Sequence, residues 1–243
     1  MSLENKDIVL ITGGLGTVGY MIVEILLLSG YRVLTTTHDK SKKSKSPNFM
    51  YMYCDFDHEN WIDYFEEWVK SNPNFTIKYL INNVRNKSNL LVDDLVSKQQ
   101  WVREFNFSTI VPYTLTNFFK KTLTNVININ SIYGVVVPNK NIYDNDKSLP
   151  PIHYGVCKSS SLKLTKEMSI RLLNYKISIN SLVLGGFSSG TPDKLKNSYE
   201  KICPTGKMLN IKNLKKPILF LLESDYDSFN GKELTIDGGW TMI

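Results

Sequence analysis

Short apolar runs alternate with amphipathic segments along the whole chain. The runs are rich in β-branched, leucine and aromatic residues, and their length is typical of buried strands. They predict about seven strands, at Asp7–Ile11, Arg32–Thr37, Phe49–Tyr53, Ile77–Ile81, Asn125–Ile129, Lys176–Leu184 and Glu233–Ile236.

Between these runs, apolar residues recur at helical spacing. Pro112 is expected to kink or divide the third predicted helix, and Pro217 is an awkward interior residue of the fifth. Phe187 to about Leu209 is predicted to be a loop. The predicted helices are Val18–Ser29, Asn60–Lys70, Leu95–Lys121, Ile152–Leu173 and Asn210–Ser224.

This alternation predicts one α/β domain over residues 1–243, with a single doubly wound parallel sheet and helices on both faces. In such a sheet, ligands bind beyond the C-terminal ends of the strands. Four polar or glycine-rich features follow predicted strands, so we expect them to share one crevice. They are the glycines after the first strand, Asn82-Asn83, Ser131 and Gly185-Gly186.

The glycines between the first strand and the first helix predict a dinucleotide site of the Rossmann type. Glycine lets the backbone approach a pyrophosphate closely, and the helix N-terminus offers N–H groups and a partial positive charge. The residues concerned are Gly13, Gly14, Gly16 and Gly19.

The end of the second predicted strand bears on the choice between NAD and NADP. An acidic residue there would bond the ribose 2′-hydroxyl of NAD. Thr37 occupies that place, with His38 and Lys40 after it, which favours NADP; Asp39 keeps NAD open. The neighbouring basic residues form either a solvated loop or a phosphate-facing one. They are Lys40, Lys42, Lys43 and Lys45.

Tyr154 and Lys158 lie one helical turn apart, on one face of a predicted helix. With the other features, this pair resembles the shorter type of short-chain dehydrogenase/reductase, over nearly the whole chain. Thr12-Gly13 with Gly19 matches the family's cofactor motif, and Asn82-Asn83 matches its Asn-Asn-Ala-Gly turn. The family's catalytic tetrad corresponds to Asn106, Ser131, Tyr154 and Lys158. Its C-terminal motif corresponds to Asp237-Gly238-Gly239.

The resemblance implies hydride transfer between C4 of a nicotinamide and a carbonyl or alcohol carbon. Tyr154 would be the acid/base. A tyrosine has an ordinary pKa of about 10, so the charge of Lys158 would be needed near neutral pH. Lys158 would also hold the nicotinamide ribose, Ser131 the substrate oxygen, and Asn106 a water that relays protons to Lys158.

The resemblance also implies which residues contact NAD(P). The predicted cofactor-binding residues are Gly13, Leu15, Gly16, Thr17, Val18, Gly19, Thr37, His38, Asp55, Phe56, Asn82, Asn83, Tyr154, Lys158, Gly185 and Gly186.

The chain departs from the family pattern in several places. Val84-Arg85 replaces Ala-Gly after Asn83, and the usual proline before Gly185 is Leu184. Between Ser131 and Tyr154 lie 22 residues, which include an inserted stretch, Val137–Pro151, expected to be a loop on the rim of the crevice. The chain also resembles one subgroup, the oxidoreductases found with bacterial flagellin-modification and surface-polysaccharide genes. The residues that carry this resemblance are Ser131–Pro138, Ile142-Tyr143-Asp144, Pro150-Pro151 before Tyr154, and the ending Asn230–Thr241. A small, polar, sugar-derived substrate and a role in surface-glycan or flagellin-glycan precursor synthesis are therefore expected.

Two alternatives stay open. The position of Gly16 resembles the spacing of sugar-nucleotide epimerases and dehydratases, which retain their cofactor. The departures at Thr17 and Val84-Arg85 also allow a catalytically idle NAD(P)-binding scaffold, although the intact tetrad argues against it.

The composition argues against nucleic-acid-binding, metal-binding, secreted and membrane proteins. The net charge is +6, but 29 basic residues are mixed with 23 acids and no nucleic-acid motif accompanies them. Three cysteines and three histidines show no disulfide or metal spacing, which predicts no metal and a reducing compartment. No signal peptide or membrane-length apolar run is visible, so a cytoplasmic protein is expected.

The remaining expectations concern assembly and two residues near Tyr154. The resemblance implies a homodimer or homotetramer, formed through Leu95–Lys121 and Ile152–Leu173. His153 and Cys157 are expected to serve packing rather than chemistry.

Overall fold

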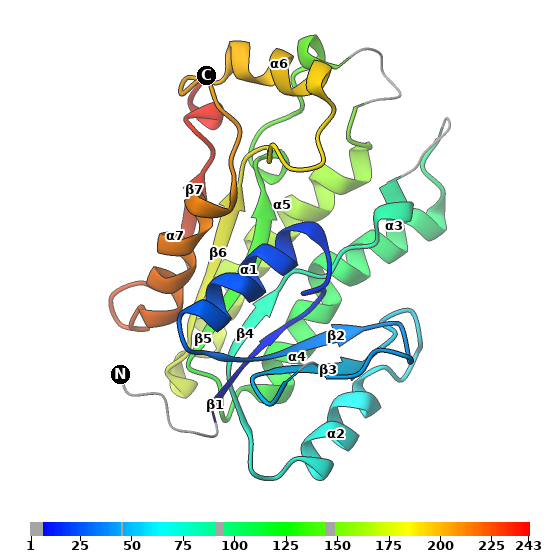
Figure 1. The fold of residues 1–243 in the computed structure, drawn as a ribbon, viewed down its shortest axis with the longest axis vertical. Coiled ribbons are helices and arrows are strands. Elements are labelled where there is room, and N and C mark those ends of the chain that lie inside the picture. The colour runs from blue at the N-terminus through cyan, green and yellow to red at the C-terminus, as the bar shows by residue number, and fades with distance from the viewer. Residues whose placement is uncertain (1–6, 45, 91–94, 144–148) are drawn as a thin grey trace.

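The computed structural model describes residues 7–44, 46–90, 95–143 and 149–243. Its centre is a seven-stranded sheet in the order β3-β2-β1-β4-β5-β6-β7, and every neighbouring pair is parallel (Figure 1). This confirms the predicted fold class. The strands are β1 Asp7–Ile11, β2 Arg32–Thr37, β3 Phe49–Tyr53, β4 Thr76–Asn82, β5 Asn125–Ser131, β6 Ser178–Leu184 and β7 Glu233–Ile236.

Helices connect the strands. The α-helices are α1 Thr17–Leu28, α2 Ile62–Ser71, α3 Lys98–Phe105, α4 Val111–Phe119, α5 Ile152–Arg171, α6 Asp193–Ile202 and α7 Ile211–Glu223. A π-helical segment, η2 Asn106–Ile110, joins α3 to α4. Short 3₁₀ turns are η1 Lys87–Leu90, η3 Ile132–Gly134, η4 Lys140–Ile142, η6 Leu173–Tyr175 and η7 Trp240–Met242.

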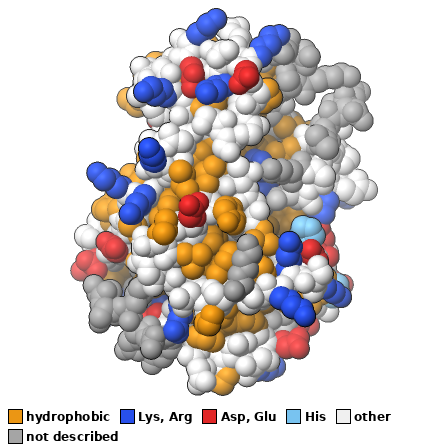
Figure 2. Space-filling view, viewed as in Figure 1, with side chains coloured by type: hydrophobic (Ala, Val, Ile, Leu, Met, Phe, Trp, Pro, Cys, Tyr) orange, Lys and Arg blue, Asp and Glu red, His pale blue; other side chains and the backbone are white. Residues whose placement is uncertain are grey.

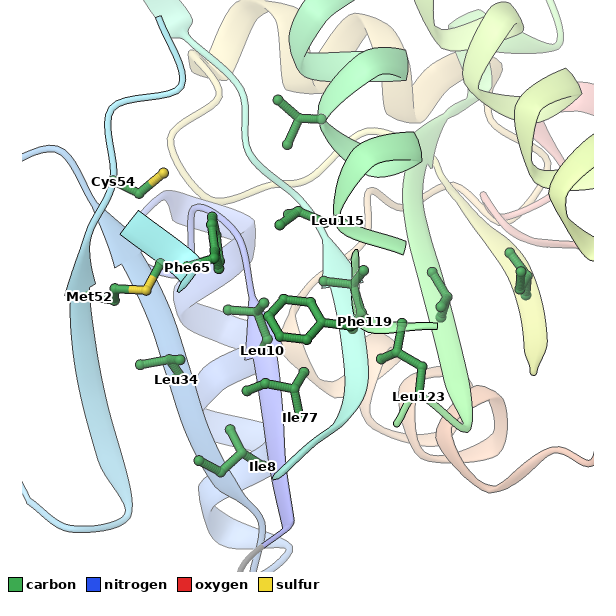
Figure 3. Packing of buried hydrophobic residues seen from close by; sticks show 14 of the residues in the cluster. Ile8, Leu10, Leu34, Met52, Cys54, Phe65, Ile77, Leu115, Phe119 and Leu123 are labelled. Carbon is green, nitrogen blue, oxygen red and sulfur yellow. The ribbon is translucent and has the colours of Figure 1, made fainter. Parts of the chain in front are cut away.

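Alternate residues of each strand point to opposite faces of the sheet, so each face has its own core. Ile8 and Leu10 pack with residues of α2, α4 and α5, including Phe65 and Leu115 (Figure 3). The intervening Val9 packs instead with α1 and α7. The two apolar layers hold the sheet between helices and leave its strand ends for a site.

The predicted helix over Leu95–Lys121 is divided, but at Asn106 rather than at Pro112. The π-helical segment starts at Asn106, and Pro112 lies in the first turn of α4. The proline has no N–H to donate, and the π-helical segment directly before it interrupts the regular α-helical bonding pattern. Pro217 stays inside α7, which continues through it.

The prediction of a loop throughout Phe187–Leu209 was wrong, because α6 forms within it. Leu195, Tyr199 and Ile202 recur at helical spacing and pack in a third core cluster with Ile142 and Trp240. The same packing holds the described part of the Val137–Pro151 insertion against α6. Residues 144–148 of that insertion lie outside the described residues.

Charged groups are dispersed on the face seen in Figure 2. Lys and Arg side chains lie around its margins among acids, and hydrophobic side chains gather in the middle. Within the described ranges, no helix has both the length and the hydropathy needed to cross a bilayer. The same part of the chain brings no three His, Cys, Asp or Glu side chains together as metal ligands.

Candidate active site

The glycine turn, Gly13–Gly19, is packed too closely for side chains at several positions. A Cβ on Gly19 would lie 2.3 Å from the carbonyl oxygen of Gly13, and one on Gly14 would lie 2.5 Å from Oγ1 of Thr35. Gly13 has a φ of 66°, in the left-handed region. The turn is tied to β2, because the N–H of Gly14 donates to Oγ1 of Thr35 at 2.9 Å.

The N-terminus of α1 opens from this turn and suits an anion. Gly16 is its N-cap residue, no side chain caps it, and its first turn contains no acid. Leu15, Gly16 and Thr17 are exposed, and Val18 is half-buried. A close-packed glycine turn leading into an uncapped helix N-terminus fits the pyrophosphate of a dinucleotide.

Asn82 and Asn83, at the end of β4, point in different directions. The Asn83 amide donates to the carbonyl oxygens of Thr12 and Gly13 at 3.2 and 3.0 Å, which braces the glycine turn. Asn82 is buried, and its amide donates to Oδ1 of Asn128 at 2.8 Å. Asn83 thus supports the cofactor turn directly, while the side chain of Asn82 crosslinks β4 to β5.

The carboxylate of Asp39, two residues beyond the end of β2, is bonded through its Oδ1 to Ser41. Oγ1 of Thr37 accepts from the N–H of Asp39 at 3.1 Å, and His38 is exposed. The Asp39 carboxylate accepts from the N–H and hydroxyl of Ser41, and the hydroxyl bond is the largest cause of its lowered pKa. Lys40 is also exposed and lies over the ring of Tyr53. Lys45 lies outside the described residues.

The segment after β3, at Asp55 and Phe56, is held by a hydrogen bond from the π-helical segment η2. The amide of Asn106 donates to the carbonyl oxygen of Phe56 at 3.0 Å. The Phe56 ring is buried against Trp61, and the Asp55 carboxylate accepts from the N–H of Asp57. The Asn106 amide is therefore occupied by this bond, and its predicted contact with a relay water stays a prediction.

Two glycines allow close contact between the segment after Ser131 and the turn of α5 that carries Tyr154 and Lys158. A Cβ on Gly134 would lie 3.0 Å from the carbonyl carbon of Lys158, and one on Gly155 would lie 2.9 Å from the carbonyl oxygen of Tyr133. The segment after Ser131 therefore packs directly on the helical turn that carries Tyr154 and Lys158. Ser131 is buried, and its Oγ accepts from the N–H of Tyr133.

Lys158 is held inward by its Nζ, which donates to the carbonyl oxygen of Ile129 at 2.9 Å. Burial lowers the pKa of Lys158, and the positive charge of Arg85 lowers it further; Tyr154 and Glu104 oppose this. The Arg85 guanidinium carbon lies 5.4 Å from the centre of the Tyr154 ring. Arg85, one of the departures from the family pattern, is thus part of the site.

Three tyrosines, named here the tyrosine rim, lie close to Tyr154 or to Gly186: Tyr133, Tyr143 and Tyr199. The Tyr133 and Tyr143 hydroxyls are hydrogen-bonded to each other. Burial raises the pKa of both phenols, and Tyr154 is close enough to raise them further. Tyr199 accepts from the N–H of Gly186 at 3.2 Å and stacks on Trp240.

The tyrosine rim was not predicted. Its members come from η3, the insertion and α6, which are distant in sequence. The available signal was the presence of Tyr133 and Tyr143 in the segment between Ser131 and Tyr154. Gly185, like Gly186, is closely packed, because a Cβ there would lie 2.8 Å from Cα of Asp237.

His153 and Cys157 are both buried beside Tyr154. Nε2 of His153 lies 3.0 Å from the carbonyl oxygen of Asn89, and the Asn89 amide donates to Glu104. Burial raises the pKa of the Cys157 thiol to about 12. Both placements agree with the prediction that these side chains pack.

A separate cavity of about 570 Å³ lies at the end of β7 and the start of α7. It contains none of the predicted catalytic or cofactor residues. Its lining includes Met208, Leu209, Asn210, Asn213 and Thr235–Gly239.

Sequence comparisons agree with this geometry. Residues 7–200 match the family model described as short chain dehydrogenase. Flagellin modification protein A of Campylobacter coli is 31% identical over 126 residues, which are 51% of this chain and 49% of that protein. A 7α-hydroxysteroid dehydrogenase of Paraclostridium sordellii is 24% identical over 89% of this chain and 83% of its own. The first match thus spans about half of that relative.

Solved structures share the whole fold. A short chain dehydrogenase from Leptospira borgpetersenii with bound NAD+ has a TM-score of 0.84 and 24% identity, over 99% of this chain and 97% of that one. A gluconate 5-dehydrogenase from Burkholderia cenocepacia, in complex with NADP and tartrate, has a TM-score of 0.80 and 18% identity, over the same shares of both chains.

Proposed function

Because the chain belongs to the short-chain dehydrogenase family of nicotinamide-dependent oxidoreductases, we propose that it acts on a small, polar, sugar-derived substrate. The observation that carries this proposal is the packing of Gly134 and Gly155, by which the segment directly after Ser131 contacts the helical turn of Tyr154 and Lys158. The hydroxyl-lined tyrosine rim beside Tyr154 suits a polyhydroxylated molecule. The likeness to a flagellin modification protein supports a role in glycan precursor synthesis.

Each tetrad residue has a distinct task in this proposal. Tyr154 gives a proton to the substrate oxygen in reduction, and takes it back in oxidation. The positive charge of Lys158 favours the phenolate, and Ser131 donates a hydrogen bond to the substrate oxygen. Asn106 holds the start of the π-helical segment against Phe56 and takes part in the relay to Lys158. A bound nicotinamide supplies or accepts the hydride.

NADP is the proposed cofactor. Asp39, the one carboxylate near the end of β2 that could bond a ribose hydroxyl, is engaged by Ser41. His38 and Lys40 are exposed beside it and can meet a 2′-phosphate.

We extend the proposal to assembly and location. The chain forms one domain and works in the cytoplasm as a homodimer or homotetramer. Exposed apolar side chains on the π-helical segment, α4 and α5 support association through these helices. They include Ile110, Tyr113, Ile152, Val156 and Ile170.

Calorimetric titration with NAD and NADP, followed by a cofactor-reduction assay on amino-sugar nucleotides and sugar acids, tests the proposal. We expect tighter binding of NADP and net reduction with one member of the panel. Turnover without net consumption of the cofactor would favour an epimerase or dehydratase. If the protein binds neither NAD nor NADP, the proposed function is contradicted, and so is the hypothesis of an NAD(P)-binding scaffold.

A further inference from the structure

Arg85 is held in place at both ends of its segment. Before it, the N–H groups of Asn83 and Val84 donate to Oγ1 of Thr12 at 2.9 and 3.1 Å. The close approach of Cα of Val84 to Gly13 fixes the same point, because a Cβ on Gly13 would lie 2.9 Å from it. The backbone that carries Arg85 is therefore anchored to the glycine turn.

The second anchor lies in η1, four residues after Arg85. The amide of the buried Asn89 donates to the carbonyl oxygen of Gln100 and to Oε2 of Glu104, both at 3.0 Å. Its carbonyl oxygen lies 3.0 Å from Nε2 of His153, the residue before Tyr154. The segment with Arg85 thus bridges the glycine turn and the catalytic helix, so its position beside Tyr154 is built into the fold.

The Arg85 guanidinium has no carboxylate partner in the part of the chain that the structure describes. The guanidinium carbon lies over the Tyr154 ring, 5.4 Å from the ring centre, and the side chain is exposed. Glu104, a carboxylate close enough to act on the pKa of Lys158, is buried and accepts from Asn89 instead. An arginine presents a planar fork of donors that matches a carboxylate or phosphate.

The surrounding charge favours an anion. Lys158 is close enough for Arg85 to lower its pKa, so two cationic groups lie near Tyr154. An anionic group bound by Arg85 would offset the repulsion between them. The glycine turn and the N-terminus of α1 are suited to the cofactor phosphates, which leaves Arg85, at the reacting end, for the substrate.

From this arrangement we infer that Arg85 determines substrate specificity by binding a carboxylate or phosphate group, so that the substrate is an acidic or phosphorylated small molecule. The inference rests on the proposed function for the assignment of Tyr154 to the reacting end. It places the anionic group a few bonds from the carbon that exchanges the hydride.

Two matched pairs of probes test this inference by calorimetry: gluconate against sorbitol, and glucose 6-phosphate against glucose. Each pair differs by one anionic group, and each is titrated into the protein with and without NADP. We expect the wild-type protein to bind one charged probe about 10- to 100-fold more tightly than its neutral partner. The pair that shows the preference identifies the anion as a carboxylate or as a phosphate.

Arg85→Gln should abolish this preference, and Arg85→Lys should restore part of it. Arg171→Gln is the matched control, because Arg171 is an exposed arginine that pairs with Glu167 at the far end of α5. An unchanged melting temperature for Arg85→Gln would exclude unfolding as the cause.

Three results would overturn the inference. One is a preference that survives in Arg85→Gln, and another is a wild-type protein that does not distinguish either pair. The third is a variant that loses NADP affinity while its anion preference persists, because Arg85 would then serve the cofactor. Failure of wild-type protein to bind NAD or NADP counts against the proposed function instead, and the titrations without cofactor still test Arg85.

Discussion

The glycine turn and the tyrosine rim lie at the same end of the sheet but are built from different material. The turn is closely packed backbone: added Cβ atoms on Gly13 and Gly19 would lie 2.9 and 2.3 Å from backbone atoms, and one on Gly14 would lie 2.5 Å from Oγ1 of Thr35. The rim is made of phenol side chains from η3, from the residue after η4 and from α6. Two of them, Tyr133 and Tyr143, are hydrogen-bonded to each other, and Tyr199 stacks on Trp240. A surface made of closely packed backbone determines which part of the cofactor can approach it. A surface made of side chains can instead differ between enzymes that act on different substrates.

The largest effect expected from this contrast is that of Gly19→Ala. The new Cβ would lie 2.3 Å from a backbone oxygen and 2.8 Å from Cα of Gly14, so the turn must open. We expect a stability loss of about 1–3 kcal/mol and a loss of cofactor affinity of about 100-fold. Thermal melting and calorimetric titration with NADP measure the two effects.

Gly30→Ala is the control for Gly19→Ala. Gly30 lies just beyond the other end of α1 with a φ of 86° and open space around it. Its substitution should cost stability while the remaining folded protein keeps its NADP affinity. Equal cofactor affinity in both variants would break the comparison, because close packing of the turn would then be irrelevant to binding.

Tyr143→Phe should have a smaller effect, confined to the substrate. It removes the bond between the two phenols and leaves the Tyr133 hydroxyl without that partner. A loss of about 1 kcal/mol corresponds to about a fivefold lower kcat/KM. Steady-state kinetics with the best substrate of the panel measures it, and NADP affinity should not change.

Tyr175→Phe, in the exposed turn η6 that follows α5, is the matched control for Tyr143→Phe. If Tyr143→Phe weakened NADP binding as strongly as it lowered turnover, the tyrosine rim would not be specific to the substrate, and the contrast with the glycine turn would be contradicted.

The smallest effect concerns the three thiols. Cys54, Cys157 and Cys203 are all buried. Burial raises the pKa of Cys157 to about 12 and raises that of Cys54 as well, so their reactive thiolates form only at strongly alkaline pH. At pH 8, iodoacetamide should label none of the three rapidly in the native protein and all three after denaturation. Rapid native labelling at Cys157 would show that the packing around Tyr154 is open.

The parts of the site that were predicted are those encoded locally. Strands, the glycine turn and the spacing of Tyr154 and Lys158 each depend on a few neighbouring residues, so periodicity and turn chemistry suffice to find them. The helix α6 also had a local pattern, at Leu195, Tyr199 and Ile202, but the glycines and prolines around it favoured a loop.

The rest of the site depends on contacts between distant segments. Tyr133 and Tyr143 become a pair only when the insertion folds against α6, and Arg85 reaches Tyr154 only through its two anchors. Asn82 and Asn83 are equivalent in the sequence, yet only one side chain can face the glycine turn, because successive strand residues point in opposite directions. No single-segment pattern distinguishes such cases.

The central claim is that Tyr154 is the acid/base of a nicotinamide-dependent oxidoreductase, and Tyr154→Phe tests it most directly. One preparation of the variant is titrated with NADP by calorimetry and then assayed for cofactor reduction beside wild type. The account predicts that NADP binding is unchanged and that turnover is about 10²- to 10⁴-fold lower than in the wild type. Substantial residual turnover with the cofactor bound would contradict it.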